Sequence, residues 1–220
     1  MKADEVQVKI CGITRPSDAI AAVEAGADAV GLMFYERSRR WVTLEQEREA
    51  ASVLPKGIAR VGVFVDADEA TIGRAIEACG LHILQLHGGE SPEFCKRFGS
   101  VQVWKAFRVT GPETLAVMKG FDTDAWLLDA AVAGQLGGSG QQFDWEIAVQ
   151  ARALGRPIVL AGGLTPGNVR EAVDRVRPYA VDVSSGVEST PGVKDFNKMR
   201  AFVVAAKGVG IPLSRTEGLR

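Results

Sequence analysis

The segment PIVLAGGLTPGNVREAVDRVRPYAVDVSSG (residues 157–186) contains two short apolar runs separated by an amphipathic stretch. The runs Pro157–Ala161 and Ala180–Val183 are continuous rather than alternating, which is typical of strands buried on both faces of a parallel sheet. Between them, Pro166–Val176 has the length and spacing of a crossover helix. We therefore predict a right-handed strand–helix–strand unit.

The same alternation extends along the chain up to Lys207. Six further strands are predicted, at Gln7–Cys11, Ala29–Phe34, Arg60–Val65, Ile83–His87, Val101–Phe107 and Trp126–Asp129. Further helices are predicted at Arg15–Ala25, Thr43–Leu54, Asp68–Cys79, Ser91–Phe98, Gly111–Met118, Asp144–Leu154 and Asp195–Ala206. Eight such units favour a closed α/β barrel, a single (β/α)8 TIM barrel, over an open sheet. We assign residues 1–207 to this catalytic barrel domain and 208–220 to a C-terminal tail that we expect to be mobile.

Composition and charge limit the kinds of partner. Lysine plus arginine (26) and aspartate plus glutamate (27) nearly cancel, so we expect no nucleic-acid partner. The first ten residues lack the apolar core of a signal peptide, and we find no run of about 18 apolar residues that would cross a membrane. Three cysteines without a Cys-x-x-Cys pair indicate no disulfide framework. We expect a cytoplasmic protein, either a monomer or a homodimer.

Metal and cofactor motifs are also missing from the sequence. The only histidines are His82 and His87, too few for a three-histidine site, and they do not form an H-E-x-x-H helix. The glycine motifs that bind dinucleotides and nucleoside triphosphates do not occur. We therefore expect no metal and no cofactor.

The strongest candidate site follows the last two predicted strands. Active sites of TIM barrels lie at the carboxyl ends of the strands. Gly162 and Gly163 follow the seventh strand, and Ser184, Ser185 and Gly186 follow the eighth. Glycines allow the backbone to approach a ligand closely, and with serine hydroxyls and backbone amides they form an anion-binding nest without any lysine. We predict that a phosphate binds here; the alternative is that these glycines only form tight turns.

Two further strand ends carry groups that can transfer protons. Cys11 ends the first predicted strand, where nearby positive charge or amide dipoles can hold a thiol as a thiolate and so make it a base or nucleophile. Asp129 ends the apolar sixth strand and is a candidate general acid. The alternatives are an inert core thiol and a solvated loop carboxylate. Because strands six, seven, eight and one are neighbours, the two groups would flank the phosphate site, which favours isomerisation of a small sugar phosphate.

The remaining strand ends give weaker signals. The segment Glu36–Trp41 contains three arginines, one of which could bind a ligand carboxylate, although a charge run is usually a solvated surface. The glycine-rich loop Gly134–Gly140 is either a lid or a plain linker. The weaker candidates for substrate contact are Gln85, His87, Gly137 and Gly138.

Eight motifs occur in a fixed order: Val8–Thr14, Gly26–Gly31, Ser38–Arg40, Gly62–Val65, Gln85–Gly88, Gly137–Gln141, Gly162–Leu164 and Val181–Glu188. In these residues the chain resembles the phosphoribosylanthranilate isomerase family of tryptophan biosynthesis, from about Val8 to Lys207. The resemblance implies an Amadori rearrangement of N-(5-phosphoribosyl)anthranilate to 1-(2-carboxyphenylamino)-1-deoxyribulose 5-phosphate.

The resemblance also implies roles for single residues. Asp129 matches the acid that protonates the furanose ring oxygen, and Cys11 matches the base that takes the C2′ proton from the Schiff base. Arg40 matches the residue that holds the anthranilate carboxylate, and the nests at Gly163 and at residues 184–186 would hold the phosphate. Arg39 stands where the family commonly has proline, which leaves open which arginine faces the ligand.

Three alternatives use the same fold. Indole-glycerol-phosphate synthase needs a catalytic lysine, but we expect Lys9 to point away from Cys11 by strand alternation. The isomerase of histidine biosynthesis performs the same rearrangement, but it typically has an aspartate where this chain has Cys11, and it has a second phosphate nest. A non-catalytic phosphate-metabolite binding barrel would need the nests but neither Cys11 nor Asp129.

Overall fold

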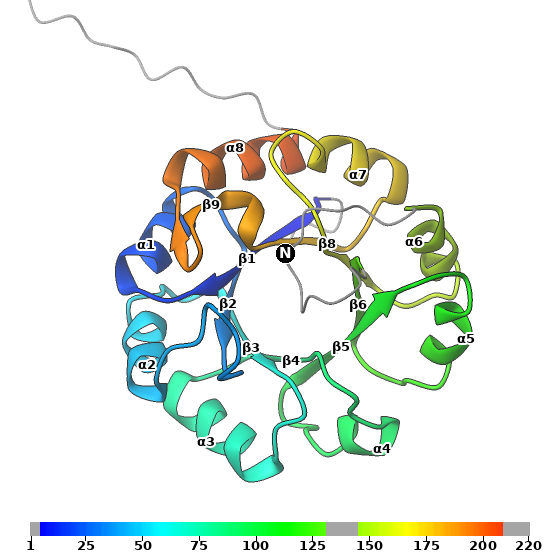
Figure 1. Cartoon of the computed structure of the whole chain (residues 1–220), viewed down its shortest axis with the longest axis horizontal. Helices are drawn as coiled ribbons and strands as arrows, with labels where there is room; N and C mark the ends of the chain where they lie inside the picture. Colours follow the sequence, from blue (N-terminus) through cyan, green and yellow to red (C-terminus); the bar gives the residue numbers. More distant parts are fainter. Residues whose placement is uncertain (1–4, 131–144, 209–220) are drawn as a thin grey trace, which may run out of the picture.

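The computed structural model describes residues 5–130 and 145–208, and within them the chain forms a closed barrel of eight parallel strands (Figure 1). Each strand pairs with the next along the chain, and the last pairs with the first, so the predicted closed barrel is confirmed. The strands are β1 (Gln7–Ile13), β2 (Ala29–Met33), β3 (Ala59–Phe64), β4 (Ile83–Leu86), β5 (Gln102–Val109), β6 (Ala125–Ala130), β7 (Ile158–Leu160) and β8 (Ala180–Val183).

Helices surround the barrel, and the side chains of Thr43, Asp68, Ser91 and Asp195 cap the helices that follow them. They are α1 (Pro16–Glu24), α2 (Leu44–Ser52), α3 (Glu69–Cys79), α4 (Pro92–Cys95), α5 (Thr114–Met118), α6 (Trp145–Arg152), α7 (Val169–Val176) and α8 (Phe196–Lys207). Thr43 and Gln46 form a capping box at the start of α2. Helix α7 begins later than predicted because the Thr165 N–H donates to the Asn168 side chain, which closes a turn before the helix.

The strands are buried on both faces, which explains their continuous apolar sequences. One apolar cluster fills the space between strands and helices, and a smaller one fills the barrel interior, with Ala29, Val61, Trp104, Leu127 and Val159 among its members. Side chains two residues apart on a strand share a face. Polar side chains that lie two residues from a member of this interior cluster, such as Gln85, Asp129 and Asp182, therefore face inward as well. They include the groups of the candidate site.

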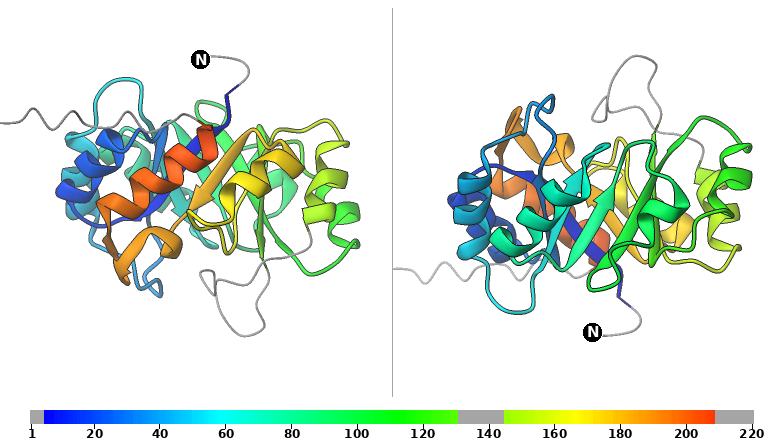
Figure 2. Two further views of the ribbon diagram at one scale, coloured as in Figure 1. Left: turned by 90° about the horizontal axis from the view of Figure 1, so that it is seen from above. Right: turned by 90° about the horizontal axis from the view of Figure 1, so that it is seen from below.

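A short hairpin that the sequence did not predict follows β8. A 3₁₀ turn (η1, Ser185–Val187) leads into β9 (Glu188–Thr190) and β10 (Val193–Lys194). The hairpin is anchored because the Thr14 hydroxyl donates to the Gly192 carbonyl at 2.6 Å and the Lys194 N–H donates to Asp18. Figure 2 shows it at the end of the barrel opposite to the start of β1, which is the end where the strands finish.

One buried carboxyl on the outside of the barrel gives a stability prediction. Glu47 on α2 accepts a hydrogen bond from the Met33 N–H through Oε1, while its Oε2 has no hydrogen-bond partner among the described residues. Burial raises the pKa of Glu47 to about 8. The folded state therefore holds this proton more tightly than the unfolded chain, and the free energy of unfolding falls as the pH rises from about 4.5 towards 8.

We expect Glu47→Gln to raise the free energy of unfolding by about 1–3 kcal/mol at pH 8 and by less at pH 4, because the amide cannot ionise. Urea denaturation at both pH values measures this difference. Glu49→Gln, on the exposed side of the same helix, is the matched control and should not reproduce this difference between the two pH values. An equal gain in the free energy of unfolding at both pH values would contradict the raised pKa of Glu47.

Candidate active site

The thiol and the carboxyl singled out above both lie on inward-facing positions near the carboxyl ends of their strands. Cys11 on β1 is 5% exposed and Asp129 on β6 is 8% exposed. Strands β7 and β8 lie between them in the barrel wall. Cys11 is paired with Gly31 on β2, where a Cβ atom would stand only 2.6 Å from the Cys11 Sγ. A glycine at position 31 is therefore what makes room for the sulfur.

Lys9 contributes a charge beside Cys11 that was not expected there. Lys9 was expected to point away from Cys11, and this was wrong, because residues two apart on a strand share a face. The Lys9 ammonium lies inside the barrel, 2.9 Å from the Asp182 carboxylate. Burial raises the pKa of the Cys11 thiol, while Lys9 acts in the opposite direction and lowers it. The net effect favours the neutral thiol over the thiolate in the free protein.

Asp129 lies close to a histidine that follows β4, with only β5 between their strands. The His87 Nε2 atom lies 3.4 Å from the Asp129 Oδ2 atom. The Gln85 amide nitrogen lies 3.1 Å from the His87 Nδ1 atom. When this amide donates to Nδ1, the neutral imidazole carries its proton on Nε2, towards Asp129. The structure thus brings three of the sequence-predicted residues into one chain of polar contacts.

The predicted phosphate nest consists of two loops in direct contact. Gly162 and Gly163 have φ values of +81° and +68°, a conformation that favours glycine. A Cβ atom on Gly186 would stand 2.1 Å from the Leu164 carbonyl oxygen, so only glycine permits this approach of the two loops. The Ser184 hydroxyl donates to the Cys11 carbonyl at 3.1 Å, which ties the nest to β1.

The nest is not free of lysine, and this part of the expectation was wrong. Lys194 on β10 is buried, and its Nζ atom lies 3.3 Å from the Ser184 carbonyl oxygen. The same ammonium donates to the Glu188 carboxylate at 2.8 Å. No sequence pattern indicates Lys194, because it belongs to a hairpin that was not predicted. Glu188 ends one of the ordered motifs, but no role followed from its position.

Arg40 reaches the same place from the loop after β2. Its Nε and Nη2 atoms donate to the two oxygens of Glu188 at 2.7 and 2.8 Å. A Cβ atom on Gly12 would collide with the Arg40 side chain at 2.3 Å, so the guanidinium stem lies directly over the end of β1. Burial would raise the pKa of Glu188, but Arg40 and Lys194 outweigh it and hold that pKa below its ordinary value. Arg39 is exposed to solvent, so Arg40 is the arginine that faces the site.

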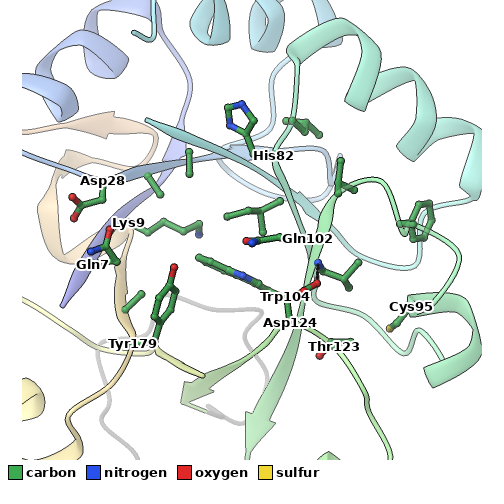
Figure 3. A pocket seen from close by; sticks show the side chains of 18 of the residues that line it. Gln7, Lys9, Asp28, His82, Cys95, Gln102, Trp104, Thr123, Asp124 and Tyr179 are labelled. Carbon is green, nitrogen blue, oxygen red and sulfur yellow. Dashed lines mark hydrogen bonds between the residues drawn. The ribbon is translucent and has the colours of Figure 1, made fainter. Parts of the chain in front are cut away.

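Cavities occur at both ends of the barrel. One of about 930 Å³ opens at the amino-terminal end, where Lys9, Trp104 and Tyr179 are among its lining residues. Figure 3 shows the Lys9 side chain extending from β1 towards the Trp104 ring. Another of about 590 Å³ opens at the carboxyl ends of β3 to β5 and includes His87. We place the candidate site at the carboxyl end, because the proton-transfer groups and the nest converge there.

Some expectations concern residues that the structure does not describe. Gly137, Gly138 and the rest of the glycine-rich loop lie outside the described residues, as does the predicted tail beyond Gly208. Within residues 5–130 and 145–208, no cluster of three or more His, Cys, Asp and Glu side chains could hold a metal ion. None of the helices in this part of the chain is long and apolar enough to cross a membrane.

Known proteins are similar to this chain over nearly its whole length. A family model described as N-(5'-phosphoribosyl)anthranilate (PRA) isomerase matches residues 8–205. An N-(5'-phosphoribosyl)anthranilate isomerase from Geobacter sp. (strain M21) is 53% identical over 91% of this chain and 98% of its own length. One from Myxococcus xanthus is 49% identical over 94% of this chain and 98% of its own. The crystal structure of the enzyme from Thermotoga maritima is 42% identical, with a TM-score of 0.85 over 93% of this chain and all of that one.

Proposed function

Because the chain belongs to the N-(5'-phosphoribosyl)anthranilate isomerase family, we propose that it converts N-(5-phosphoribosyl)anthranilate to 1-(2-carboxyphenylamino)-1-deoxyribulose 5-phosphate in tryptophan biosynthesis, with Asp129 as acid and Cys11 as base. The observation that carries this assignment is the placement of a carboxyl and a thiol on inward-facing strand ends on either side of a glycine–serine nest. One solved relative is in complex with reduced 1-(o-carboxyphenylamino)-1-deoxyribulose 5-phosphate, which is consistent with such a substrate.

In the proposed reaction the two groups act in sequence. Asp129 gives a proton to the furanose ring oxygen, the bond from C1′ to that oxygen breaks, and the nitrogen lone pair forms a Schiff base. Cys11 then takes the proton from C2′, and the electrons of that C–H bond give an enol with the amine restored. The enol becomes the ketone by gaining a proton at C1′ and losing one from its hydroxyl. No atom is gained or lost, and the proton on Cys11 returns to Asp129 through solvent.

The nest and its surroundings suit the anionic end of the substrate. Backbone amides of the loops at Gly163 and Gly186 can donate to phosphate oxygens, as in other anion nests. The buried Lys194 ammonium adds positive charge beside Ser184. With the phosphate fixed here, the sugar extends over the barrel opening, between the Cys11 thiol and the Asp129 carboxyl.

Arg40 is the proposed partner of the anthranilate carboxylate. Its hydrogen bonds to described residues through the side chain use Nε and Nη2, which leaves Nη1 for a ligand. We expect Arg40→Ala to weaken substrate binding by about 2–5 kcal/mol, mainly as a higher KM, because a buried charged hydrogen bond is lost. Steady-state kinetics measure this, and Arg39→Ala, which removes the exposed neighbour, is the matched control. A normal KM in Arg40→Ala would contradict the assignment.

The function itself is tested by assaying two substrates side by side. Turnover of N-(5-phosphoribosyl)anthranilate is followed by fluorescence, and the aminoaldose of histidine biosynthesis is offered to the same preparation. We expect kcat/KM to be at least about 30-fold higher for the anthranilate compound, because only this substrate offers Arg40 a carboxylate. Failure to turn over the anthranilate compound, or preference for the other, would reject the proposal.

A further inference from the structure

A buried ion pair lies in the barrel interior, directly below the candidate base. Lys9 on β1 is 1% exposed, and Asp182 on β8 is its partner in the strand register. The ammonium donates to the Asp182 carboxylate at 2.9 Å. The acid–base chemistry proposed above uses neither residue. A buried ion pair is weak evidence for stability, because desolvation offsets much of its attraction, so a role at the site has to be considered.

The ammonium and the thiol border the same small space. A Cβ atom on Gly31 would stand 2.6 Å from the Cys11 Sγ and 3.1 Å from the Lys9 Nζ. The absence of a side chain at Gly31 on β2 therefore leaves a space that the ammonium and the sulfur, both on β1, share. Because Lys9 and Cys11 are two residues apart on one strand, their side chains share the inner face.

Four charged groups act on the Cys11 sulfur, from four different elements. They are Lys9 on β1, Asp182 on β8, Lys194 on β10 and Arg40 on the loop after β2. Lys194 and Arg40 both donate to Glu188, which neutralises part of their charge. Lys9 has the largest charge effect on the pKa of Cys11, greater than the opposing effect of Asp182.

We propose that Lys9 is a positioning residue for the reaction: its ammonium, held in place by Asp182, faces the Cys11 sulfur and stabilises the thiolate that acts as base. The inference rests on the proposed function, because it assigns a task to Lys9 within the same site. Asp182 has a double role, since it keeps the lysine charged and also limits how far the ammonium favours the thiolate.

The protonation of Lys9 agrees with this role. Burial alone would lower the pKa of Lys9, but Asp182 and Cys11 outweigh it, so the pKa lies above its ordinary value. Lys9 therefore remains an ammonium throughout the neutral range. A thiolate in a site shielded from water is costly without a nearby cation, and a fixed ammonium supplies one without a conformational change.

The test compares two variants that differ only in this cation, Asp182→Asn and Lys9→Met/Asp182→Asn. Neither contains an unpaired buried carboxylate at position 182. The Cys11 thiolate is titrated by its ultraviolet absorbance, as the difference from the same protein carrying Cys11→Ser. We expect the midpoint of the double variant to lie at least about one pH unit above that of Asp182→Asn. We also expect kcat at neutral pH to be at least about tenfold lower, with KM changed less than about threefold.

A second buried ion pair provides the control. Lys105 and Glu90 lie 2.9 Å apart, are equally buried, and are absent from the groups that act on Cys11. The variant Lys105→Met/Glu90→Gln should leave the Cys11 midpoint unchanged. This separates the effect of the Lys9 charge from a general loosening of the barrel.

Equal midpoints in the two folded variants would overturn the inference. If the double variant does not fold, Lys9→Gln/Asp182→Asn replaces it, because the two amides can bond to each other where the ion pair stood. A midpoint of this variant that does not lie above that of Asp182→Asn would overturn the inference. The titration does not depend on turnover. A Cys11→Ser enzyme with full activity would therefore refute the proposed base while leaving the charge effect on the thiol measurable.

Discussion

Asp129→Asn is expected to lower kcat for isomerisation by about 10²–10⁴-fold while KM changes by no more than a few-fold. The amide has nearly the same shape as the carboxyl, but it cannot give a proton to the ring oxygen. Without that proton the C1′–O bond must break to an alkoxide, so ring opening becomes the slow step. The change leaves the nest and Arg40 untouched, which is why substrate binding should persist.

The matched control for this variant is Asp124→Asn, at the opposite end of the same strand. The Asp124 carboxylate accepts a hydrogen bond from the Val103 N–H, which an asparagine oxygen can also accept. The Asp124→Asn variant should therefore retain wild-type kinetics. His87, whose Nε2 atom lies 3.4 Å from Asp129, is the rival acid. Near-normal kcat in Asp129→Asn together with a large loss in His87→Gln would transfer the acid role to the histidine.

The fold could be predicted because its signals are local. Continuous apolar runs such as Pro157–Ala161 become strands buried on both faces, and the helix predicted from Thr43 begins there, with Thr43 as its N-cap. The hairpin at residues 188–194 could not be predicted, because its strands have two and three residues and show no periodicity. Its position depends on contacts with Thr14 and Asp18, which are distant in the sequence.

The candidate site could be predicted only in part, because some of its contacts join segments that are distant in the sequence. Cys11 and Asp129 could be assigned to the site from their positions at the ends of predicted strands. Their inner face follows from the period-two alternation, which is a property of the strand itself. Lys9 obeys the same rule: it lies two residues before Cys11 and shares the inner face with it, so the expectation that it points away was wrong. The bridge from Arg40 through Glu188 to Lys194 joins three segments, so no pattern within one segment indicates it.

Cys11→Ser is the other change expected to have a large effect, again a loss of about 10²–10⁴-fold in kcat. A serine hydroxyl occupies nearly the same space, but it releases its proton far less readily than a thiol does. Burial already raises the pKa of the Cys11 thiol, and the largest effect that opposes it is that of the Lys9 ammonium. A hydroxyl at this position gains too little from the same ammonium to replace the base.

A substrate deuterated at C2′ identifies which step each variant slows. In Cys11→Ser, removal of the C2′ proton becomes rate-limiting, so the deuterium isotope effect on kcat should rise to its full primary value. In Asp129→Asn, ring opening precedes that step and limits the rate, so the isotope effect should remain small. Cys79→Ser, which changes a buried thiol on α3 far from the nest, should match the wild type in both measurements. A Cys11→Ser enzyme with normal kcat, or with an isotope effect no larger than that of the wild type, would show that the sulfur does not take the proton.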